Sequence, residues 1–441
     1  MKTKSFKTIS FCYFLLLSLN LVFSQTPTWK LLPASPYLND RIDDLFFINP
    51  QTGWIVGGNA TIHKTTNGGL TWQHISTVSG YLRSVCFLDS LTGFLGKLDG
   101  PMFFYKTVNG GLNWSAISMD SNAISRVCGL SSFGNTVIAS GWFNGNPKVA
   151  ISTNRGVSWK NINMINYANA LVDCYMTGPT EAFVVGGIGS HYENRKAVIL
   201  YTSNAGDTWE TRFISSRIKN WGWKISFPST NVGYVSLENS YSLDSSFFAK
   251  TTNGGLNWVE KYYGIGMEYR EQGIGFVNEN TGWMGGYNKF LATTNGGDNW
   301  SILNIAPEFS AINRIRFYSD TIGYASGLRV YKYTTEDFLS NINVQNTIPG
   351  KNSLHQNYPN PFNPVTVIKF EIFEKSVSTI KIYNAAGEEV YSFAHGYRTP
   401  GIIEFAWYGT DYNGNLMPSG VYFYRLETEK YTETKKMILV R

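Results

Sequence analysis

Short runs of alternating apolar and polar residues occupy most of the chain, and clusters of turn residues separate them. Residues 42–48 and 54–56 form one such pair of runs. Alternation with a period of two predicts β-strands, so each pair predicts a hairpin. In the clearest of these hairpins, an aromatic residue is followed six positions later by Gly and then by a second aromatic. The first aromatic of this signature is Phe47, Phe87, Phe227, Phe276 or Phe317. Weaker copies lie at residues 130–137 and 175–183, which brings the expected hairpins to seven.

Seven tryptophans recur over the same region at intervals of 42 to 50 residues, beginning at Trp29. Six of them close a phrase of the form Ser/Thr-x-Asn-x-Gly-x-x-Trp. Asn bonds to nearby backbone and tolerates left-handed geometry, Gly supplies a positive φ, and Trp covers the turn with a large apolar face. The Asn, Gly and Trp positions of the six copies are Asn67, Gly69, Trp72, Asn109, Gly111, Trp114, Asn154, Gly156, Trp159, Asn204, Gly206, Trp209, Asn253, Gly255, Trp258, Asn295, Gly297 and Trp300.

Each tryptophan begins a further short strand, so one repeat holds four strands in about 43 residues, which is the content of a propeller blade. Residues 28–32 are a tryptophan strand without the three strands that should precede it. Residues 314–335 hold three strands without a tryptophan phrase. We therefore expect the N-terminal strand to complete the last blade and close a seven-bladed propeller over residues 27–336, leaving no open edge.

The repeat stops after residue 336, and the Asn-rich residues 337–353 predict a linker. Residues 354–441 contain further alternating runs, such as 365–372 and 420–426, with Gly-containing turns between several of them. Short strands at this spacing predict a small immunoglobulin-like sandwich. The predicted fold class is therefore all-β, a seven-bladed β-propeller followed by an Ig-like β-sandwich.

The N-terminal residues 1–24 combine Lys2, Lys4 and Lys7 with an uncharged, mostly apolar stretch, which predicts a secretory signal peptide. No later apolar run approaches the roughly 20 residues of a membrane helix, so we expect a secreted or cell-surface protein without a membrane span. The formal net charge of +6 includes those three lysines, and charged residues make up 15% of the chain. This small net charge predicts no nucleic-acid partner.

Three cysteines follow the predicted signal peptide: Cys86, Cys128 and Cys174. An odd number implies no complete disulfide framework. Because they occupy equivalent places in their repeats, we expect buried small side chains, with a single disulfide as the open alternative. The five histidines are dispersed, and no phosphate-binding or dinucleotide-binding loop occurs in the sequence, so we expect neither a metal nor a cofactor.

The tryptophan phrase resembles the Asp-box, or BNR, repeat of sialidase-type propellers, with Asn where those proteins usually carry Asp. Together with the hairpin signature and the seven-fold count, it resembles the photosystem II stability and assembly factor family, which implies an arginine-rich face for protein binding. The C-terminal phrases Tyr-Pro-Asn-Pro-Phe-Asn-Pro and Trp-Tyr-Gly-Thr-Asp resemble the type A C-terminal sorting domain of type IX secretion cargo. That resemblance implies outer-membrane passage by the type IX machinery, followed by release or surface attachment.

Functional residues of a propeller gather where the innermost strands begin, because all blades converge there. Aligning the hairpins places these residues near that point: Arg41, Arg83, Arg126, Asn169, Trp221, Trp223, Arg270 and Arg314. Such arginines can clamp carboxylates by bidentate hydrogen bonds. The alternative is that they are solvated turn residues whose stems cover the rim.

Propeller glycosidases use a pair of carboxylates, for which Asp44, Asp173 and Glu268 are the candidates. Asp43 lies beside Asp44 in the first blade, whereas Asp173 lies in the fourth, so we expect these acids to be too far apart to react together. We therefore expect a monomeric, non-enzymatic binding or assembly platform whose ligand is a protein segment or a surface glycan at the channel mouth. The alternative is an exported glycoside hydrolase or lyase of the sialidase-like propeller type.

Overall fold

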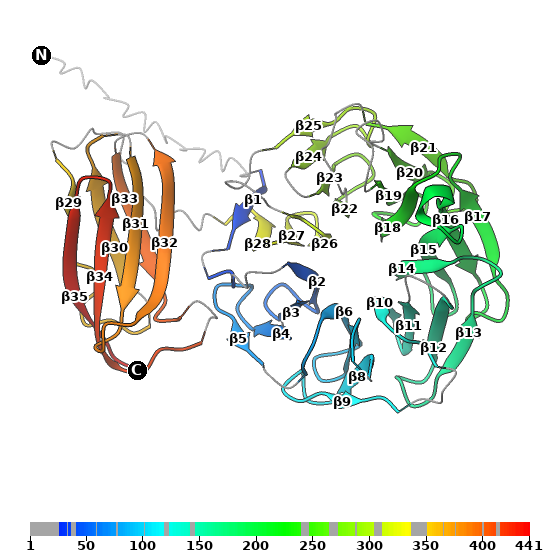
Figure 1. The fold of residues 1–441 in the computed structure, drawn as a ribbon, viewed down its shortest axis with the longest axis horizontal. Helices are drawn as coiled ribbons and strands as arrows, with labels where there is room; N and C mark the ends of the chain where they lie inside the picture. Colours follow the sequence, from blue (N-terminus) through cyan, green and yellow to red (C-terminus); the bar gives the residue numbers. More distant parts are fainter. Residues whose placement is uncertain are drawn as a thin grey trace, which may run out of the picture.

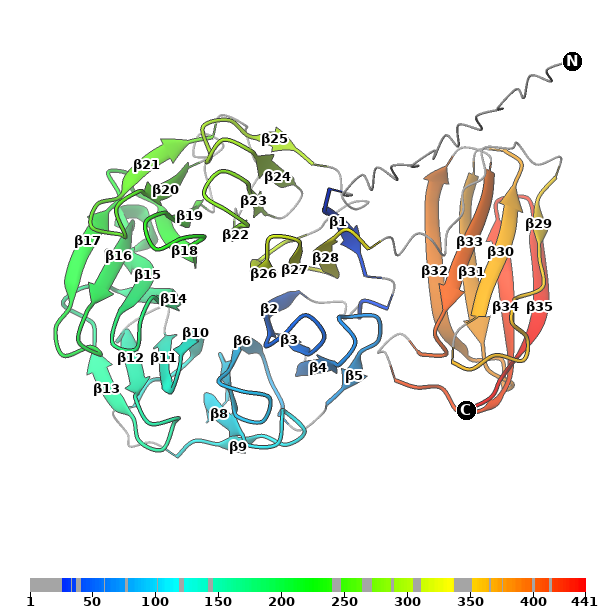
Figure 2. The same cartoon turned by 180° about the vertical axis from the view of Figure 1, so that it is seen from behind.

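A computed structural model describes most of residues 26–336 and 351–441. The segments it does not describe are 1–25, 33, 37–40, 59, 76–77, 101, 119–122, 142–145, 240–246, 264–271, 287–288, 304–310, 337–350, 365, 375, 399–400 and 412–414, together with the side chains of 393–406. Figures 1 and 2 show a ring of small sheets and a separate sandwich of longer strands. The regular secondary structure of the described residues consists of strands and one 3-10 turn, Tyr192–Asn194, which confirms the predicted fold class. No helix in this part of the chain is long and apolar enough to cross a membrane.

Seven four-stranded antiparallel sheets form the ring, each with one strand facing the central channel (Figure 1). In blades 1 to 7 these inner strands are β2 (Ile42–Phe47), β6 (Leu82–Phe87), β10 (Val127–Phe133), β14 (Ala170–Met176), β18 (Asn220–Ser226), β22 (Gly273–Phe276) and β26 (Arg314–Ser319). The second strands are β3 (Gly53–Gly57), β7 (Gly93–Lys97), β11 (Thr136–Gly141), β15 (Ala182–Ile188), β19 (Gly233–Asn239), β23 (Gly282–Gly285) and β27 (Ile322–Ser326).

The third and fourth strands carry each sheet outward to the rim of the disc. The third strands are β4 (Thr61–Thr65), β8 (Phe104–Thr107), β12 (Lys148–Ser152), β16 (Lys196–Thr202), β20 (Phe247–Thr251), β24 (Phe290–Thr293) and β28 (Val330–Thr334). The fourth strands of blades 1 to 6 are β5 (Gln73–His74), β9 (Ser115–Ala116), β13 (Lys160–Asn163), β17 (Glu210–Ile214), β21 (Val259–Tyr262) and β25 (Ser301–Ile302).

The N-terminal strand β1 (Thr28–Leu31) is the fourth strand of blade 7. It pairs antiparallel with β28, and Trp29 lies opposite Tyr333. The Trp29 ring also packs edge-on against Trp283 of blade 6, at 5.7 Å between ring centroids. Strands from the two ends of the repeat region are therefore hydrogen-bonded in one sheet, and the ring is closed.

The aromatic residues of the hairpin signature stack between neighbouring blades. Phe47 ends the inner strand of blade 1 and lies opposite Gly53, where an added Cβ would be 2.5 Å from the Phe47 ring. The aromatic that follows Gly53 is Trp54, which stacks on Phe87 of blade 2 with ring centroids 3.5 Å apart. Tyr324 of blade 7 stacks on Phe47 at the same distance. A glycine is needed at this position because the aromatic ring occupies the space of its side chain.

The tryptophan phrase folds as a compact turn between the third and fourth strands. In blade 1 the amide of Gly69, at φ 88°, donates to Thr65 Oγ1 at 2.9 Å, and the amide of Thr71 donates to Asn67 Oδ1 at 2.9 Å. The Trp72 side chain is 1% exposed, so the turn is covered. The same two bonds recur around Asn109, Asn154, Asn204, Asn253 and Asn295.

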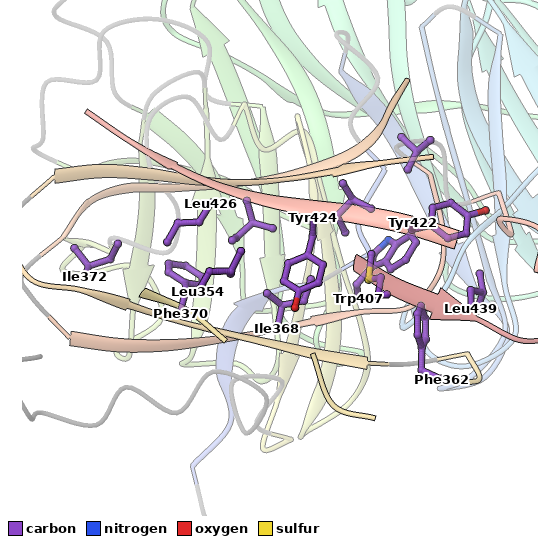
Figure 3. Close-up of a cluster of buried hydrophobic side chains, with 14 residues drawn as sticks. Leu354, Phe362, Ile368, Phe370, Ile372, Trp407, Tyr422, Tyr424, Leu426 and Leu439 are labelled. Atoms are coloured by element: carbon purple, nitrogen blue, oxygen red, sulfur yellow. The ribbon is translucent and has the colours of Figure 1, made fainter. Parts of the chain in front are cut away.

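The C-terminal sandwich has two antiparallel sheets, one of order β29-β30-β33 and one of order β32-β31-β34-β35. The strands are β29 (Ser353–Leu354), β30 (Thr366–Ile372), β31 (Ser376–Tyr383), β32 (Glu389–Arg398), β33 (Gly401–Trp407), β34 (Gly420–Thr428) and β35 (Thr432–Leu439). Figure 3 shows its apolar core between the sheets, with Phe362, from the proline-rich phrase, near Trp407 at 5.6 Å between ring centroids. This core is built independently of the propeller.

Candidate functional site

Irregular pairing near the start of the inner strands positions the residues of the central channel. The register between first and second strands shifts between Ile42 and Asp44 in blade 1, and between Leu82 and Ser84 in blade 2. Comparable shifts occur in blades 3, 4 and 5. A bulge of this kind turns a side chain out of the normal alternation. Asp43 lies at the first shift and Arg83 at the second.

Asp43 is the centre of a buried cluster at the end of the channel where the inner strands begin, which we call the start mouth. Its carboxylate accepts from Arg41 Nε at 2.8 Å and forms a short ion pair with Arg83. Asn313 Nδ2 donates to the Asp43 carbonyl at 2.6 Å, and Trp223 Nε1 donates to Asn313 Oδ1 at 3.0 Å. Burial raises the pKa of Asp43, but Arg41 and Arg83 outweigh this effect, so the net pKa is lowered.

A second buried cluster joins three blades across the channel. Arg314 Nε lies 2.7 Å from Asp44, while Nη1 and Nη2 donate to the two Asp173 oxygens at 2.7 and 2.9 Å. Asp44 also accepts from the amides of Leu45 and Val85. The expectation that acids in blades 1 and 4 lie far apart was therefore wrong, because one guanidinium from blade 7 bridges Asp44 and Asp173.

The environment of Asp173 favours its ionised form. Burial alone would raise the pKa of Asp173, but the positive charges of Arg314 and Lys224 have the larger effect and lower it to about 2. Arg314 is 4% exposed, and the pKa of its guanidinium is raised in turn, since Asp173 and Asp44 outweigh the effect of burial. The two charges thus hold each other ionised in the interior.

Lys224, on β18, is a buried lysine that was not predicted from the sequence as a site residue. It is 1% exposed, and its Nζ forms no hydrogen bond with any residue that the structure describes. Burial and the neighbouring Arg314 lower its pKa to about 7, although Asp173 partly opposes them. The amine therefore loses much of its charge near neutral pH.

The other predicted site residues lie in different settings. Arg126 is exposed at φ 53°, just before β10. Asn169 Oδ1 accepts from the Gly189 amide at 2.7 Å. Trp221 is partly buried beneath the Arg195 guanidinium, whose carbon lies 4.3 Å from the ring centroid. Two further candidates, Arg270 and Glu268, fall outside the described residues.

Two regions of the chain match protein families. Residues 24–124 match the family described as photosynthesis system II assembly factor YCF48, and residues 364–431 match the FlgD Ig-like domain. Among solved structures, YCF48 bound to D1 peptide has a TM-score of 0.51 at 21% identity, covering 71% of this chain and 99% of that chain. The propeller is YCF48-like in fold.

Other solved structures share the YCF48-like arrangement. YCF48 from Cyanidioschyzon merolae has a TM-score of 0.55 at 17% identity, covering 70% of this chain and 99% of that chain. An ancestral GH74 enzyme has a TM-score of 0.53 at 12% identity, covering 92% of this chain and 63% of that chain. At these identities the likeness extends to the fold alone. No curated protein sequence matches the chain.

The ion pairs between acids and arginines determine the chemistry available in the channel of the YCF48-like propeller. A general acid must hold a proton near the working pH, which requires a raised carboxyl pKa. The pKa values of Asp43 and Asp173 are lowered, and both carboxylates are fully buried against guanidinium groups. Arg83 and Arg314 are likewise buried in ion pairs, so they are not open to a ligand. At the start mouth, Arg126, Trp221 and part of Arg41 remain accessible.

Cys86, Cys128 and Cys174 are all buried and free of disulfides. Burial raises the pKa of Cys86 to about 12, so its reactive thiolate is scarce at neutral pH. Within the described part of the chain, no group of three or more His, Cys, Asp or Glu residues could hold a metal ion.

Sequence reasoning missed several described residues of the channel, among them Gln272, Asn313, Lys224 and Arg316. Gln272 Oε1 accepts a short hydrogen bond from Arg41. Arg316 follows Arg314 by two positions on β26, so alternation along the strand places both on the same face. That spacing was the available signal, whereas Lys224 lies within a register shift, between Gly222 and Ile225, that the sequence does not display.

Proposed function

We propose that the mature protein is an exported, non-enzymatic platform whose propeller binds an acidic protein segment at the start mouth. Arg126 and Arg41 attract the carboxylates of the segment, and Trp221 supplies an aromatic surface beside them. The segment is bound and positioned without a covalent step. The protein acts as a monomer in this role, because one ring provides the whole mouth.

The observation that carries the proposal is the excess of cations among the described residues around the channel. The buried carboxylates of Asp43, Asp44 and Asp173 are matched by the guanidinium groups of Arg41, Arg83, Arg314 and Arg316. Glu238 adds a further carboxylate near Arg41, while Arg126 and Arg195 add two more cations. Clefts lined by one sign of charge concentrate ligands of the opposite sign.

A protein segment is favoured over a surface glycan on two grounds. Guanidinium groups recognise carboxylates bidentately, and acidic segments present several carboxylates in a row. A solved structure that shares the fold is described as YCF48 bound to D1 peptide, and this supports a peptide as the ligand. Binding of a surface glycan instead of a peptide is an alternative outcome of the binding test.

Export is part of the same proposal. Residues 1–24 serve as a signal peptide, and residues 354–441 serve as a type IX sorting module that delivers the propeller to the cell surface or the medium. The match of residues 364–431 to an Ig-like domain supports a compact C-terminal module. Deleting residues 354–441 should leave the propeller in the periplasm of a type IX-competent host. Unchanged secretion of the truncated chain would remove the sorting role.

The binding test uses fluorescence anisotropy with purified residues 25–441. The probes are a labelled glutamate-rich peptide and a glutamine-rich peptide of equal length. We expect the acidic peptide to bind more tightly, and its affinity to fall with added salt as exposed charges are screened. Arg126→Asn is the diagnostic variant, because Asn tolerates the left-handed backbone and lacks the positive charge.

The matched control is Arg155→Asn, since Arg155 also has a positive φ, 61°, but lies in a rim turn paired with Asp89. We expect Arg126→Asn to weaken peptide binding about five-fold or more, while Arg155→Asn does not. Equal binding of both peptides, or equal effects of both variants, would contradict the proposal. Binding to a glycan array alone would replace the segment by a glycan, and glycan cleavage would restore the hydrolase alternative.

A further inference from the structure

A cavity of about 340 Å³ lies at the opposite end of the channel, where the inner strands end. We call this end the end mouth. The cavity is lined by the final residues of β14, β18 and β22 and by the whole length of β26. These four strands follow one another around the ring in Figures 1 and 2. A smaller cavity of about 150 Å³, lined by Phe46 of β2 among others, shares Arg316 and Tyr318 with it. The end mouth is thus distinct from the start mouth that carries Arg126.

Arg316 is the cationic group of this cavity that is partly exposed, at 28% of its side chain. A guanidinium has five N–H donors. Arg314, the other arginine in the lining, is 4% exposed, ion-paired with Asp44 and Asp173, and donates from Nη1 and Nη2 to Asp173. Arg316 makes one long contact, from Nη2 to Asp44 at 3.4 Å. Its Nε is buried and forms no hydrogen bond with a described residue, although 28% of the side chain is exposed.

Aromatic rings form part of the wall around Arg316, beside polar residues such as Ser226 and Asp320. Tyr175 and Phe227 lie side by side with ring centroids 5.5 Å apart, and Tyr318 is half exposed at the rim. The Arg316 guanidinium carbon lies 5.8 Å from the Phe46 ring centroid. Flat apolar walls favour a flat apolar ligand, and a few placed polar groups fix its orientation.

We propose that the end-mouth cavity binds a compact carboxylate with a flat apolar body, its carboxylate on Arg316 and its ring against Tyr175, Phe227 and Tyr318. The cavity is near the lower limit of ligand pockets, about 300–1,000 Å³, so it accepts a single aromatic acid or one terminal residue. The same chemistry has two sources, a free aromatic acid and the C-terminal residue of a peptide chain. Neither depends on binding at the start mouth.

Isothermal titration calorimetry of purified residues 25–441 tests the proposal with two matched pairs. The first pair is 3-phenylpropionate and its amide, and the second is acetyl-Ala-Phe with a free or an amidated C-terminus. We expect each acid to bind at least about tenfold more tightly than its amide, because charge-assisted bonds to a guanidinium require the carboxylate. Tighter binding of the peptide acid identifies a chain end as the source, and equal binding identifies a free acid.

Arg316→Gln should weaken binding of either acid by about tenfold or more. Arg217→Gln is the control, because Arg217 also lies over an aromatic ring, Phe247, but outside the cavity. Tyr318→Ala removes a half-exposed wall without touching the ion pairs, and should weaken binding several-fold while the melting temperature stays unchanged. Absence of binding by both acids, equal affinity of acid and amide, or wild-type affinity in both cavity variants would overturn the proposal.

Discussion

Replacing Lys224 by Met should stabilise the protein, and the gain should depend on pH. The variant keeps the length and apolar character of the side chain but removes a buried amine that no described residue hydrogen-bonds. The pKa of that amine falls from 10.5 to about 7 on folding. Since one pKa unit corresponds to about 1.4 kcal/mol, holding the charged amine in the channel costs about 4–5 kcal/mol at pH 6.

The sign of the pH dependence follows from the proton count. Between pH 7 and 10.5 the unfolded chain keeps the Lys224 proton while the folded chain releases it, so the stability of the native protein rises with pH. The expected slope from this group is about 1.4 kcal/mol per pH unit. The advantage of Lys224→Met should therefore be largest below pH 7 and shrink steadily toward pH 10.

Equilibrium denaturation in urea at several pH values between 6 and 10 measures this difference. Lys332→Met is the matched control, because Lys332 is also a buried lysine but pairs with Glu336 at 2.8 Å. We expect the control variant to be less stable than the wild type at every pH in this range. A Lys224→Met variant that is destabilised, or whose advantage does not change with pH, would refute the reasoning.

Three further predictions concern the rim, the channel and the thiols. Trp72→Ala should lower the free energy of unfolding by about 3–5 kcal/mol in urea denaturation, because the indole is 1% exposed. Arg314→Met should cost about 3–5 kcal/mol in the same assay, because it leaves Asp44 and Asp173 buried without their shared guanidinium. The three cysteines should resist a thiol reagent in the native protein and react fully in denaturant, since all are buried and none forms a disulfide.

Much of the fold could be predicted because its determinants are local and repeated. The six-residue spacing from Phe47 to Gly53 reflects a tight hairpin in which the ring covers the glycine. The spacing from Thr65 to Trp72 reflects a turn closed by its own side chains. Such contacts span a few positions, so the sequence displays them directly, and their recurrence predicts the ring.

The channel could be predicted only in part because its contacts join distant blades. Residue types and inner-strand positions indicated an arginine-rich mouth, but the pairing of Arg314 with Asp44 and Asp173 spans 270 and 141 positions of sequence. Register shifts at Asp43 and Arg83 turn these side chains into the channel, and a period-two pattern does not predict such shifts. Some of the arginines expected to face a ligand therefore neutralise Asp44 and Asp173, the acids considered for the alternative hydrolase function.

The central claim is that the channel acids are held ionised in buried ion pairs, and the proposal that the propeller binds a ligand depends on it. Carbon-13 NMR of aspartate-labelled protein, with Asp173→Asn to assign the signal, measures the ionisation of the Asp173 carboxyl directly. We predict that it stays ionised from pH 7 down to the acid unfolding of the protein, in line with a pKa of about 2. A native-state titration of this carboxyl above about pH 5, in the range of a general acid, would contradict the account.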